Sequence, residues 1–198
     1  MNPTFIEAAR RTQIIDCTIA CIAELGYAQT SFTQIAKRAK ISKGVISYYF
    51  ATKDELMRAV VREVLSAFTA FVVSHIDAEP TVSAQLRAFI EANLAFMDTH
   101  RKPMIATFDI IRSARTEDGQ TLISSDLAET DLTALAAHLQ RGQEQGEFRA
   151  FNARIMAATI LALRNELLVQ LAYKPDLDLK AYAQEWVILF DLATRQSG

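Results

Sequence analysis

The chain has 198 residues, 51% of them hydrophobic and 22% charged, which is typical of a globular protein and argues against a disordered one. The net charge of −2 argues, by itself, against nucleic-acid binding, but it conceals a split. Residues 1–53 hold seven Lys and Arg against three Asp and Glu, a net charge of +4, whereas residues 54–198 carry −6. This asymmetry predicts that the basic segment meets a polyanion, the alternative being ordinary charge scatter.

The N-terminal stretch MNPTFIEAARRTQ lacks the apolar core of a signal peptide. No apolar run approaches about 18 residues, so no transmembrane helix and no membrane partner are expected. Cys17 and Cys21 lie four residues apart among apolar neighbours, with no further metal ligands nearby. They are expected to pack as reduced thiols, which predicts a cytoplasmic protein without a metal site.

Helical spacing of apolar residues recurs along the chain, and no alternating run is long enough to predict a strand. The pattern predicts an all-α fold of about nine helices, with a functional boundary near residue 50, where the charge changes sign, between residues 1–50 and residues 51–198. The expected helices are 4–25, 31–38, 42–49, one starting after Thr52, one between Pro80 and His100, one starting at Pro103, and 122–144, 152–173 and 178–195.

The second and third expected helices have the length and separation of a helix-turn-helix. Ser31 starts the first of them with a capping-box pattern, and Ser42 can cap the second. Lys43 and Gly44 then occupy the first turn, where a cation and a residue without a side chain suit a helix whose N-terminus approaches phosphate. The alternative is a helical hairpin with a solvated lysine face.

The stretch TSFTQIAKRAKISKGVISYYFATKDEL (30–56) resembles the DNA-binding signature of the TetR family of bacterial transcription regulators, and residues 10–27 are similar to that family's first helix. Two positions depart from the pattern. Lys40 stands where the turn usually has glycine, which costs roughly 1 kcal/mol if the residue is left-handed. Ser47 stands at the position of the usual phosphate-contacting tyrosine, with Tyr48 next to it. The matching positions are Ile35, Ala36, Ala39, Ser42, Gly44, Ile46, Tyr49, Phe50 and Lys53.

The resemblance implies a ligand-responsive regulator, expected to be a repressor, that binds a palindromic DNA operator as a homodimer and is released by a small-molecule effector. It also implies that residues 1–50 form a helix-turn-helix DNA-binding domain and residues 51–198 an effector-binding and dimerisation domain. Lys43, Tyr49 and Lys53 are expected to bind phosphate, and Val45 and Ser47 to face base edges. Arg10 or Arg11 either reaches the DNA or stays solvated. The full set of candidate DNA contacts is Ser31, Thr33, Ser42, Lys43, Gly44, Val45, Ser47, Tyr48, Tyr49 and Lys53.

The last two expected helices carry more large apolar residues than one buried face needs, which indicates an intermolecular face. The resemblance implies that they form a four-helix bundle with a second copy, whose twofold symmetry would match a palindrome. The alternative is that they complete the core of a monomer. The expected interface residues are Leu163, Leu167, Leu171, Trp186, Leu189 and Phe190.

The middle helices place polar side chains on apolar stripes, and a buried polar group needs a partner, of which a ligand is one kind. The resemblance implies a small-molecule effector in this region, often apolar or aromatic, and Arg164 would favour an anionic group. Each of these residues, taken singly, is more often an ordinary core or surface position. The candidates are Phe68, Phe71, His75, Phe89, Asn93, Met97, Met104, Phe108, Arg164 and Asn165.

No enzyme motif is present: His75, His100 and His138 lie on different expected helices, and there is no dinucleotide fingerprint, P-loop or nucleophile elbow. No catalytic residue, metal or cofactor is therefore expected. The rival interpretation is an all-α carrier of small molecules or lipids, or an interaction module, without sequence-specific DNA binding. That interpretation would leave the basic segment without a purpose.

Overall fold

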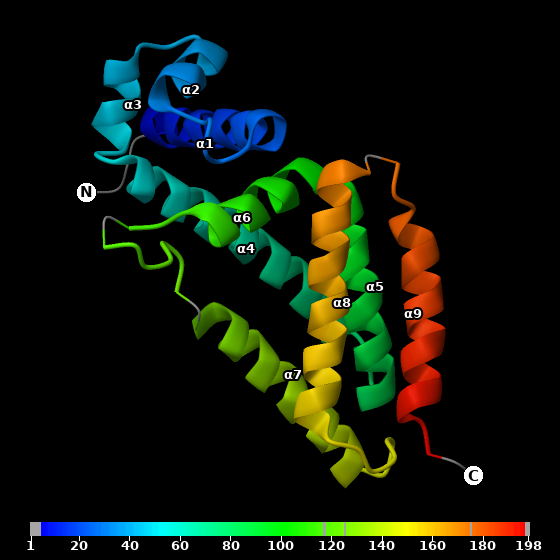
Figure 1. Cartoon of the computed structure of the whole chain (residues 1–198). Helices are drawn as coiled ribbons and strands as arrows, with labels where there is room; N and C mark the ends of the chain where they lie inside the picture. The colour runs from blue at the N-terminus through cyan, green and yellow to red at the C-terminus, as the bar shows by residue number, and fades with distance from the viewer. Residues whose placement is uncertain (1–4, 117, 125, 175, 197–198) are drawn as a thin grey trace. The chain divides into compact units, whose positions relative to one another are not determined.

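The computed structural model describes residues 5–116, 118–124, 126–174 and 176–196. These residues form nine α-helices and no strand, apart from two isolated bridges, which confirms the all-α prediction (Figure 1). The helices are α1 (Phe5–Leu25), α2 (Phe32–Ala39), α3 (Lys43–Tyr49), α4 (Lys53–Ile76), α5 (Val82–Thr99), α6 (Arg101–Ser113), α7 (Asp126–Glu144), α8 (Ala153–Tyr173) and α9 (Leu179–Thr194).

The chain forms two compact units, and each is described separately. The first comprises Met1–Leu65 and Lys102–Ser124, and the second comprises Ser66–Arg101 and Ser125–Gly198. The boundary between the two compact units thus lies within α4. The predicted boundary near residue 50 rests on charge instead, and it stays a prediction about function.

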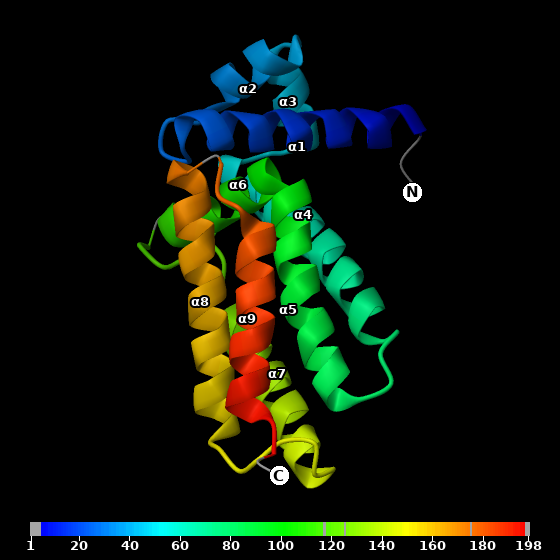
Figure 2. The same cartoon turned by 90° about the vertical axis from the view of Figure 1, so that its right-hand side faces the viewer.

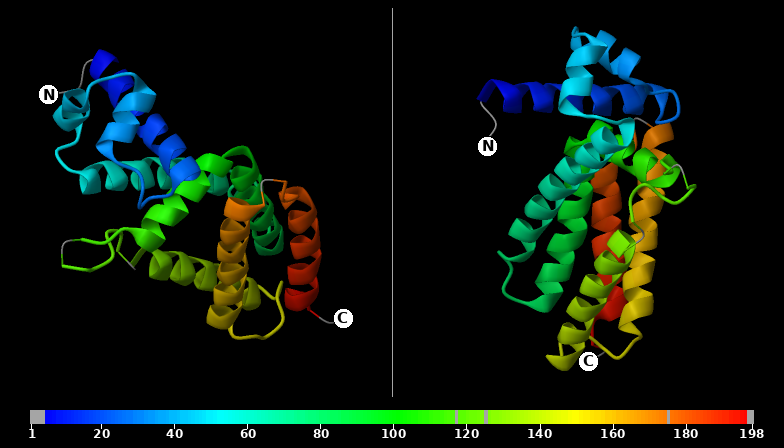
Figure 3. Two further views of the ribbon diagram at one scale, coloured as in Figure 1. Left: turned by 45° about the horizontal axis from the view of Figure 1, so that its top comes forward. Right: turned by 90° about the vertical axis from the view of Figure 1, so that its left-hand side faces the viewer.

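In the first unit, α1 packs against α2 and α2 against α3, and these three helices, blue to cyan, lie together in Figure 3. Their shared core consists of aliphatic and aromatic side chains spaced three or four residues apart, as helix faces require. Ile14, Ile35, Ile46 and Phe50 are fully buried in it. The short helices α2 and α3 are therefore stabilised by packing, since isolated helices of this length are marginal.

The segment between α6 and α7 differs from the sequence expectation. α7 begins at Asp126, later than the predicted 122, because the preceding residues form a tight turn instead. Thr116 donates its N–H to the Gln120 carbonyl oxygen at 2.9 Å, and Leu122 donates to Ala114 at 3.0 Å. Leu122 is fully buried there, so its apolar side chain anchors the turn rather than starting a helix.

In the second unit, α5 packs against α9 and α7, and α7 packs against α8 (Figure 2). The Glu147 carboxylate accepts the N–H groups of Val82 and Ser83 at 3.1 and 2.8 Å, which places negative charge at the N-terminus of α5. At Gly142 any Cβ would collide with the Phe148 ring, so the turn after α7 requires glycine for close packing.

Helix α8 is long and apolar enough to cross a membrane by length and composition alone. A single such helix is weak evidence, because helices from the core of soluble proteins pass the same test. Here α8 packs on α7, and its Arg164 pairs with Asp131 of that helix.

Candidate nucleic-acid interface and effector cavity

The helix-turn-helix consists of α2, the turn 40–42 and α3. Ser31 caps α2 in a complete capping box with Gln34, and the Ser42 side chain caps α3 by accepting the Val45 N–H. Both caps confirm the sequence prediction. Ile46 turns inward, so the opposite side of α3 faces solvent. Seven of the ten candidate DNA contacts are exposed, namely Ser31, Thr33, Ser42, Lys43, Gly44, Ser47 and Tyr48, while Val45, Tyr49 and Lys53 are half-buried.

Lys40 ends α2 in the left-handed conformation, with φ 54° and ψ 42°, and its N–H donates to the carbonyls of Ala36 and Lys37. A residue with a Cβ pays roughly 1–2 kcal/mol for this conformation, which glycine adopts freely. The lysine side chain is exposed, so a positive charge projects from the turn into solvent.

Gly44 lies in the first turn of α3 and is exposed. A Cβ built at this position would meet only Ser42 Oγ, at 3.7 Å, which is an ordinary contact. The fold therefore does not require glycine here, although glycine costs about 1 kcal/mol relative to alanine in a helix. We therefore expect glycine at position 44 to favour an interaction with another molecule, one whose surface approaches α3 closely.

Tyr48 and Tyr49 end α3 with their rings edge to face, 5.1 Å apart between centroids. Tyr48 is 75% exposed. Its hydroxyl can donate to a phosphate. This exposed hydroxyl lies next to Ser47, the position at which the sequence departs from the signature.

The two arginines of α1 brace the helix-turn-helix. Arg11 donates to the Tyr49 carbonyl oxygen at 3.3 Å, and its guanidinium lies 4.3 Å from the centre of the Phe50 ring. Arg10 donates to Gln13 Oε1 at 2.7 Å, and Gln13 donates to the carbonyl at the end of α2. Both side chains thus bind the protein itself, an arrangement that neither sequence alternative included.

Lys53 is half-buried at the start of α4 rather than free in solvent. Its Nζ donates to the Tyr27 carbonyl oxygen at 3.1 Å and lies 4.2 Å above the centre of the Tyr27 ring. Burial lowers the pKa of Lys53, opposed by the nearby Asp54 carboxylate. The Tyr27 N–H is itself bound by Asp109 Oδ2 of α6 at 2.7 Å. An ammonium has three N–H donors, so two remain with which Lys53 can reach a phosphate.

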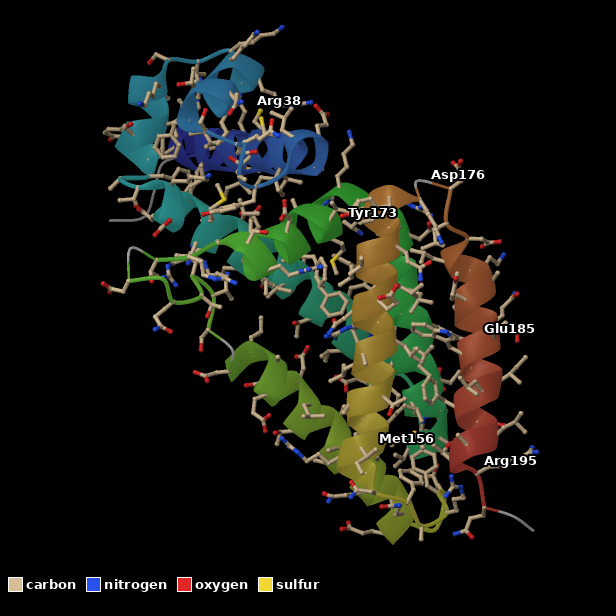
Figure 4. All side chains as sticks on the ribbon, viewed as in Figure 1. Arg38, Met156, Tyr173, Asp176, Glu185 and Arg195 are labelled. Atoms are coloured by element: carbon tan, nitrogen blue, oxygen red, sulfur yellow. The ribbon has the colours of Figure 1, made fainter. Side chains whose placement is uncertain are left out.

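Arg38, labelled in Figure 4, is neutralised by Glu24, which its guanidinium contacts through both terminal nitrogens at 2.7 and 2.6 Å. The hydrogen bond from Arg38 is the main reason that the pKa of Glu24 is lowered. By contrast, Lys37, Lys40 and Lys43 are exposed and form no ion pair with any residue that the structure describes. These three cations make the α2–α3 side of the first unit positive.

The second unit contains a cavity of about 240 Å³ between α4, α5, α7 and α8. Its wall is mostly apolar, with five polar side chains among aliphatic and aromatic ones. The lining residues are Phe68, Thr69, Val72, Val73, Ile76, Gln85, Phe89, Asp131, Ala134, Leu135, His138, Leu161 and Arg164.

Of the ten residues predicted to bind an effector, Phe68, Phe89 and Arg164 line this cavity. The other seven are absent from its lining. Met104 and Phe108 belong to α6 in the first unit. Phe71, His75, Asn93, Met97 and Asn165 belong to the second unit but do not contribute to the wall.

Sequence reasoning missed four polar residues of the wall, Thr69, Gln85, Asp131 and His138. Asp131 and His138 are seven residues apart on α7, so they share one face of that helix. Leu135 lies between them on the same face, and this spacing was the signal that could have identified them.

The polar side of the cavity is built around Arg164. Its Nη2 donates to Asp131 Oδ2 at 3.1 Å, and the arginine side chain is 16% exposed. Arg164 Nε is buried without a hydrogen-bond partner among the described residues.

His138 is neutral in this arrangement. Its Nε2 lies 3.2 Å from the Val82 carbonyl oxygen, an acceptor, and its Nδ1 lies 2.8 Å from Arg141 Nη2, a donor. These partners require a ring with hydrogen on Nε2 alone. Burial also lowers the pKa of His138.

Four of the six predicted interface residues, Leu167, Leu171, Trp186 and Phe190, are buried within the chain itself. Leu163 is half-buried, and Leu189 is 51% exposed. Ile188, Leu189 and Leu192 of α9 together form an exposed apolar stripe, here called the α9 stripe.

Residues 14–60 match the family described as bacterial regulatory proteins, tetR family. The HTH-type transcriptional regulator BetI of Escherichia coli O45:K1 (strain S88 / ExPEC) is 39% identical over 82 residues. This match covers 41% of the chain and 42% of the relative, which is less than half of either protein.

Solved structures match nearly the whole chain. The fatty acid degradation regulator FadR from Bacillus halodurans is 24% identical, with a TM-score of 0.79 over 92% of this chain and 94% of that one. AibR in complex with isovaleryl coenzyme A and operator DNA is 19% identical, with a TM-score of 0.76 over 90% of this chain and 96% of that one. At these identities the likeness shows a shared fold.

Proposed function

We propose that the chain is a ligand-responsive transcriptional repressor of the tetR family of bacterial regulatory proteins, because its residues 14–60 match that family. It binds a palindromic operator in double-stranded DNA as a homodimer, and a small-molecule effector releases it. As a regulator of transcription it acts in the cytoplasm, where the DNA is, and it carries out no catalysis.

The observation that carries the proposal is the exposed side of α3. A helix fits the major groove of B-DNA, and its first residues come closest to the base edges. Lys43 is exposed for a phosphate, and Gly44 leaves room for close approach. Val45 and Ser47 follow as the candidates for base edges, Val45 by contact with a thymine methyl group.

The remaining candidates position the helix. Tyr48, Tyr49 and Lys53 bind phosphates on one side of the groove, and Ser31 and Thr33 at the start of α2 bind them on the other. Lys53 does so while keeping its bond to Tyr27, so it both orders the first unit and contacts DNA.

We propose that a second copy of the chain covers the α9 stripe together with the exposed side of α8. Three large aliphatic residues exposed on two successive turns are costly in water. Each is about half exposed, so burying the rest of each side chain contributes roughly 1 kcal/mol. Two linked half-sites then bind DNA far more tightly than one. Because Trp186 and Phe190 are already buried within the chain, Leu189 is the better position at which to test the interface.

The cavity of the second unit is the proposed effector site. Helix α4 begins with Lys53 in the first unit and contributes Phe68 and Ile76 to the cavity in the second. An effector that favours another position of α4 would therefore change the presentation of α3. A tenfold loss of DNA affinity needs about 1.4 kcal/mol of such differential binding.

The alternative, an all-α carrier or interaction module, explains the cavity but not the charge distribution. It gives no reason for three unpaired lysines beside a glycine that the fold does not need. The two proposals differ in their salt dependence, because phosphate binding weakens steeply with salt whereas binding of an apolar ligand barely changes.

The deciding experiment is selection of bound fragments from randomised duplex DNA by the purified protein at physiological salt. An enriched palindrome is expected. If no sequence is enriched, either alone or after addition of cell extract to supply a co-repressor, the protein is not a sequence-specific regulator. The enriched duplex then serves as the probe for the effector screen.

A further inference from the structure

The size of the cavity limits what it can hold. Its volume of about 240 Å³ lies below the roughly 300–1,000 Å³ of typical ligand pockets. An engineered apolar cavity of about 150 Å³ takes up benzene, so a substituted benzene is a suitable size here. Long chains and nucleotide-bearing groups would have to remain largely outside.

The charges on the wall cancel. Asp131 and Arg164 are the only lining residues that carry a formal charge, and their side chains form an ion pair at 3.1 Å. His138 is held neutral by its two hydrogen bonds. An anionic ligand would therefore bring an uncompensated charge next to the Asp131 carboxylate in a mostly apolar space, which is costly.

One donor in this wall lacks a partner. Arg164 Nε is buried, and its N–H makes no hydrogen bond with any described residue. Because an arginine side chain has only donors, the group that is missing is an acceptor. A buried donor left unsatisfied costs about 1–3 kcal/mol. Because Nε has almost no accessible surface, a small rotation of the Arg164 side chain has to turn it toward the cavity. A ligand that then supplies an acceptor recovers the cost of the unsatisfied donor without needing a charge.

We infer that the cavity binds a small, uncharged, mostly apolar molecule with one hydrogen-bond acceptor, an aryl ketone being the simplest type, and that Arg164 Nε donates to this acceptor. The inference rests on the proposed function only in taking the cavity as the effector site. It replaces the sequence expectation that Arg164 selects an anion, because the sequence did not reveal that Asp131 is the counter-ion of Arg164.

The test uses three probes of similar size: acetophenone, which is neutral with an acceptor; benzoate, which is anionic; and ethylbenzene, which has no acceptor. The full chain is methyl-labelled, and titrations follow the NMR signals of Leu135 and Leu161, two leucines of the cavity wall. Acetophenone should bind at least about tenfold more tightly than either other probe.

Two variants separate charge from hydrogen bonding. Asp131→Asn leaves Arg164 uncompensated, so the preference for acetophenone over benzoate should fall at least about tenfold. Arg164→Met removes the donor, so acetophenone should bind no better than ethylbenzene. Glu129→Gln is the matched control, because Glu129 forms an exposed ion pair with Arg154 on the same two helices away from the cavity wall. This control should leave all three affinities unchanged.

Any of three results would overturn the inference: benzoate binding the native chain as tightly as acetophenone, ethylbenzene doing so, or no probe shifting the Leu135 and Leu161 signals. If a variant fails to fold, which the methyl spectrum reveals, the comparison on the native chain decides. The titrations contain no DNA, so a failed operator selection does not affect them. Conversely, a palindrome selected by a protein that prefers benzoate would leave the regulator intact and refute only the ligand class.

Discussion

Gly44→Ala should raise stability and lower DNA affinity at the same time. The added methyl group meets only Ser42 Oγ at 3.7 Å, so the folded chain accommodates it. Alanine is favoured over glycine within a helix by about 0.5–1 kcal/mol, and the effect is smaller near the N-terminus. For a chain of this size, 1 kcal/mol corresponds to roughly 2–4 °C in the melting temperature.

The loss of affinity comes from the same methyl group. If the start of α3 lies against DNA, the new Cβ stands between the helix and the duplex and disturbs the neighbouring contact of Lys43. Losing one good contact costs about 1–3 kcal/mol, which is about fivefold to 150-fold in the dissociation constant. Thermal unfolding and fluorescence anisotropy with the selected operator measure the two effects separately.

The matched control is Ser66→Ala, at an exposed position in the middle of α4 that lies outside the proposed interface. It changes helix propensity in the same direction but should leave DNA affinity unaltered. Unchanged operator affinity of Gly44→Ala would refute the close approach of α3 to DNA. Lower stability would refute the conclusion that the fold has no need of glycine at this position.

Three further changes test other parts of the structure. Lys53→Ala should weaken binding to all DNA sequences equally, and should also cost about 1–2 kcal/mol in urea unfolding because the Tyr27 contacts are lost; an altered sequence preference would exclude the phosphate role. Leu189→Glu should give monomers in light scattering with poor operator affinity, whereas Leu127→Glu, at an exposed leucine of α7, should remain dimeric; a dimeric Leu189→Glu would contradict the interface. His138 has a pKa below that of an unfolded histidine, so the unfolded chain binds the extra proton first and stability should fall as pH drops from about 7 toward 5.5. The urea midpoint of unfolding should fall less over this pH range in His138→Gln than in the native chain. An equal fall in both proteins would show that other groups cause the pH dependence.

The helix-turn-helix was predictable from the sequence because its determinants are local. Ser31 and Gln34 form their capping box within four residues, and Ile46 and Phe50 follow the spacing of a single helix face. Such patterns specify secondary structure and burial without knowledge of distant partners. The short α2 and α3 were thus located to within about one residue, the usual uncertainty of a helix boundary.

The cavity was not predictable in the same way, because it depends on how four helices are rotated against one another. Arg164 looked like an isolated cation in the sequence, but its counter-ion Asp131 lies 33 residues away on another helix. Similarly, Lys53 looked free for phosphate, but it binds the carbonyl of Tyr27, 26 residues earlier. Trp186 suggested an intermolecular face until the structure placed it within the chain's own core.

The cations of the basic segment, residues 1–53, fall into two groups in the structure. Of its seven cations, Arg10, Arg11, Arg38 and Lys53 bind groups within the first unit. The exposed cations without an ion pair among the described residues are Lys37, Lys40 and Lys43. Lys40 holds its place in a left-handed conformation that costs roughly 1–2 kcal/mol and that glycine would avoid. Three lysines around one turn, rather than the net charge of the whole segment, therefore supply the electrostatic attraction that the proposed interface needs.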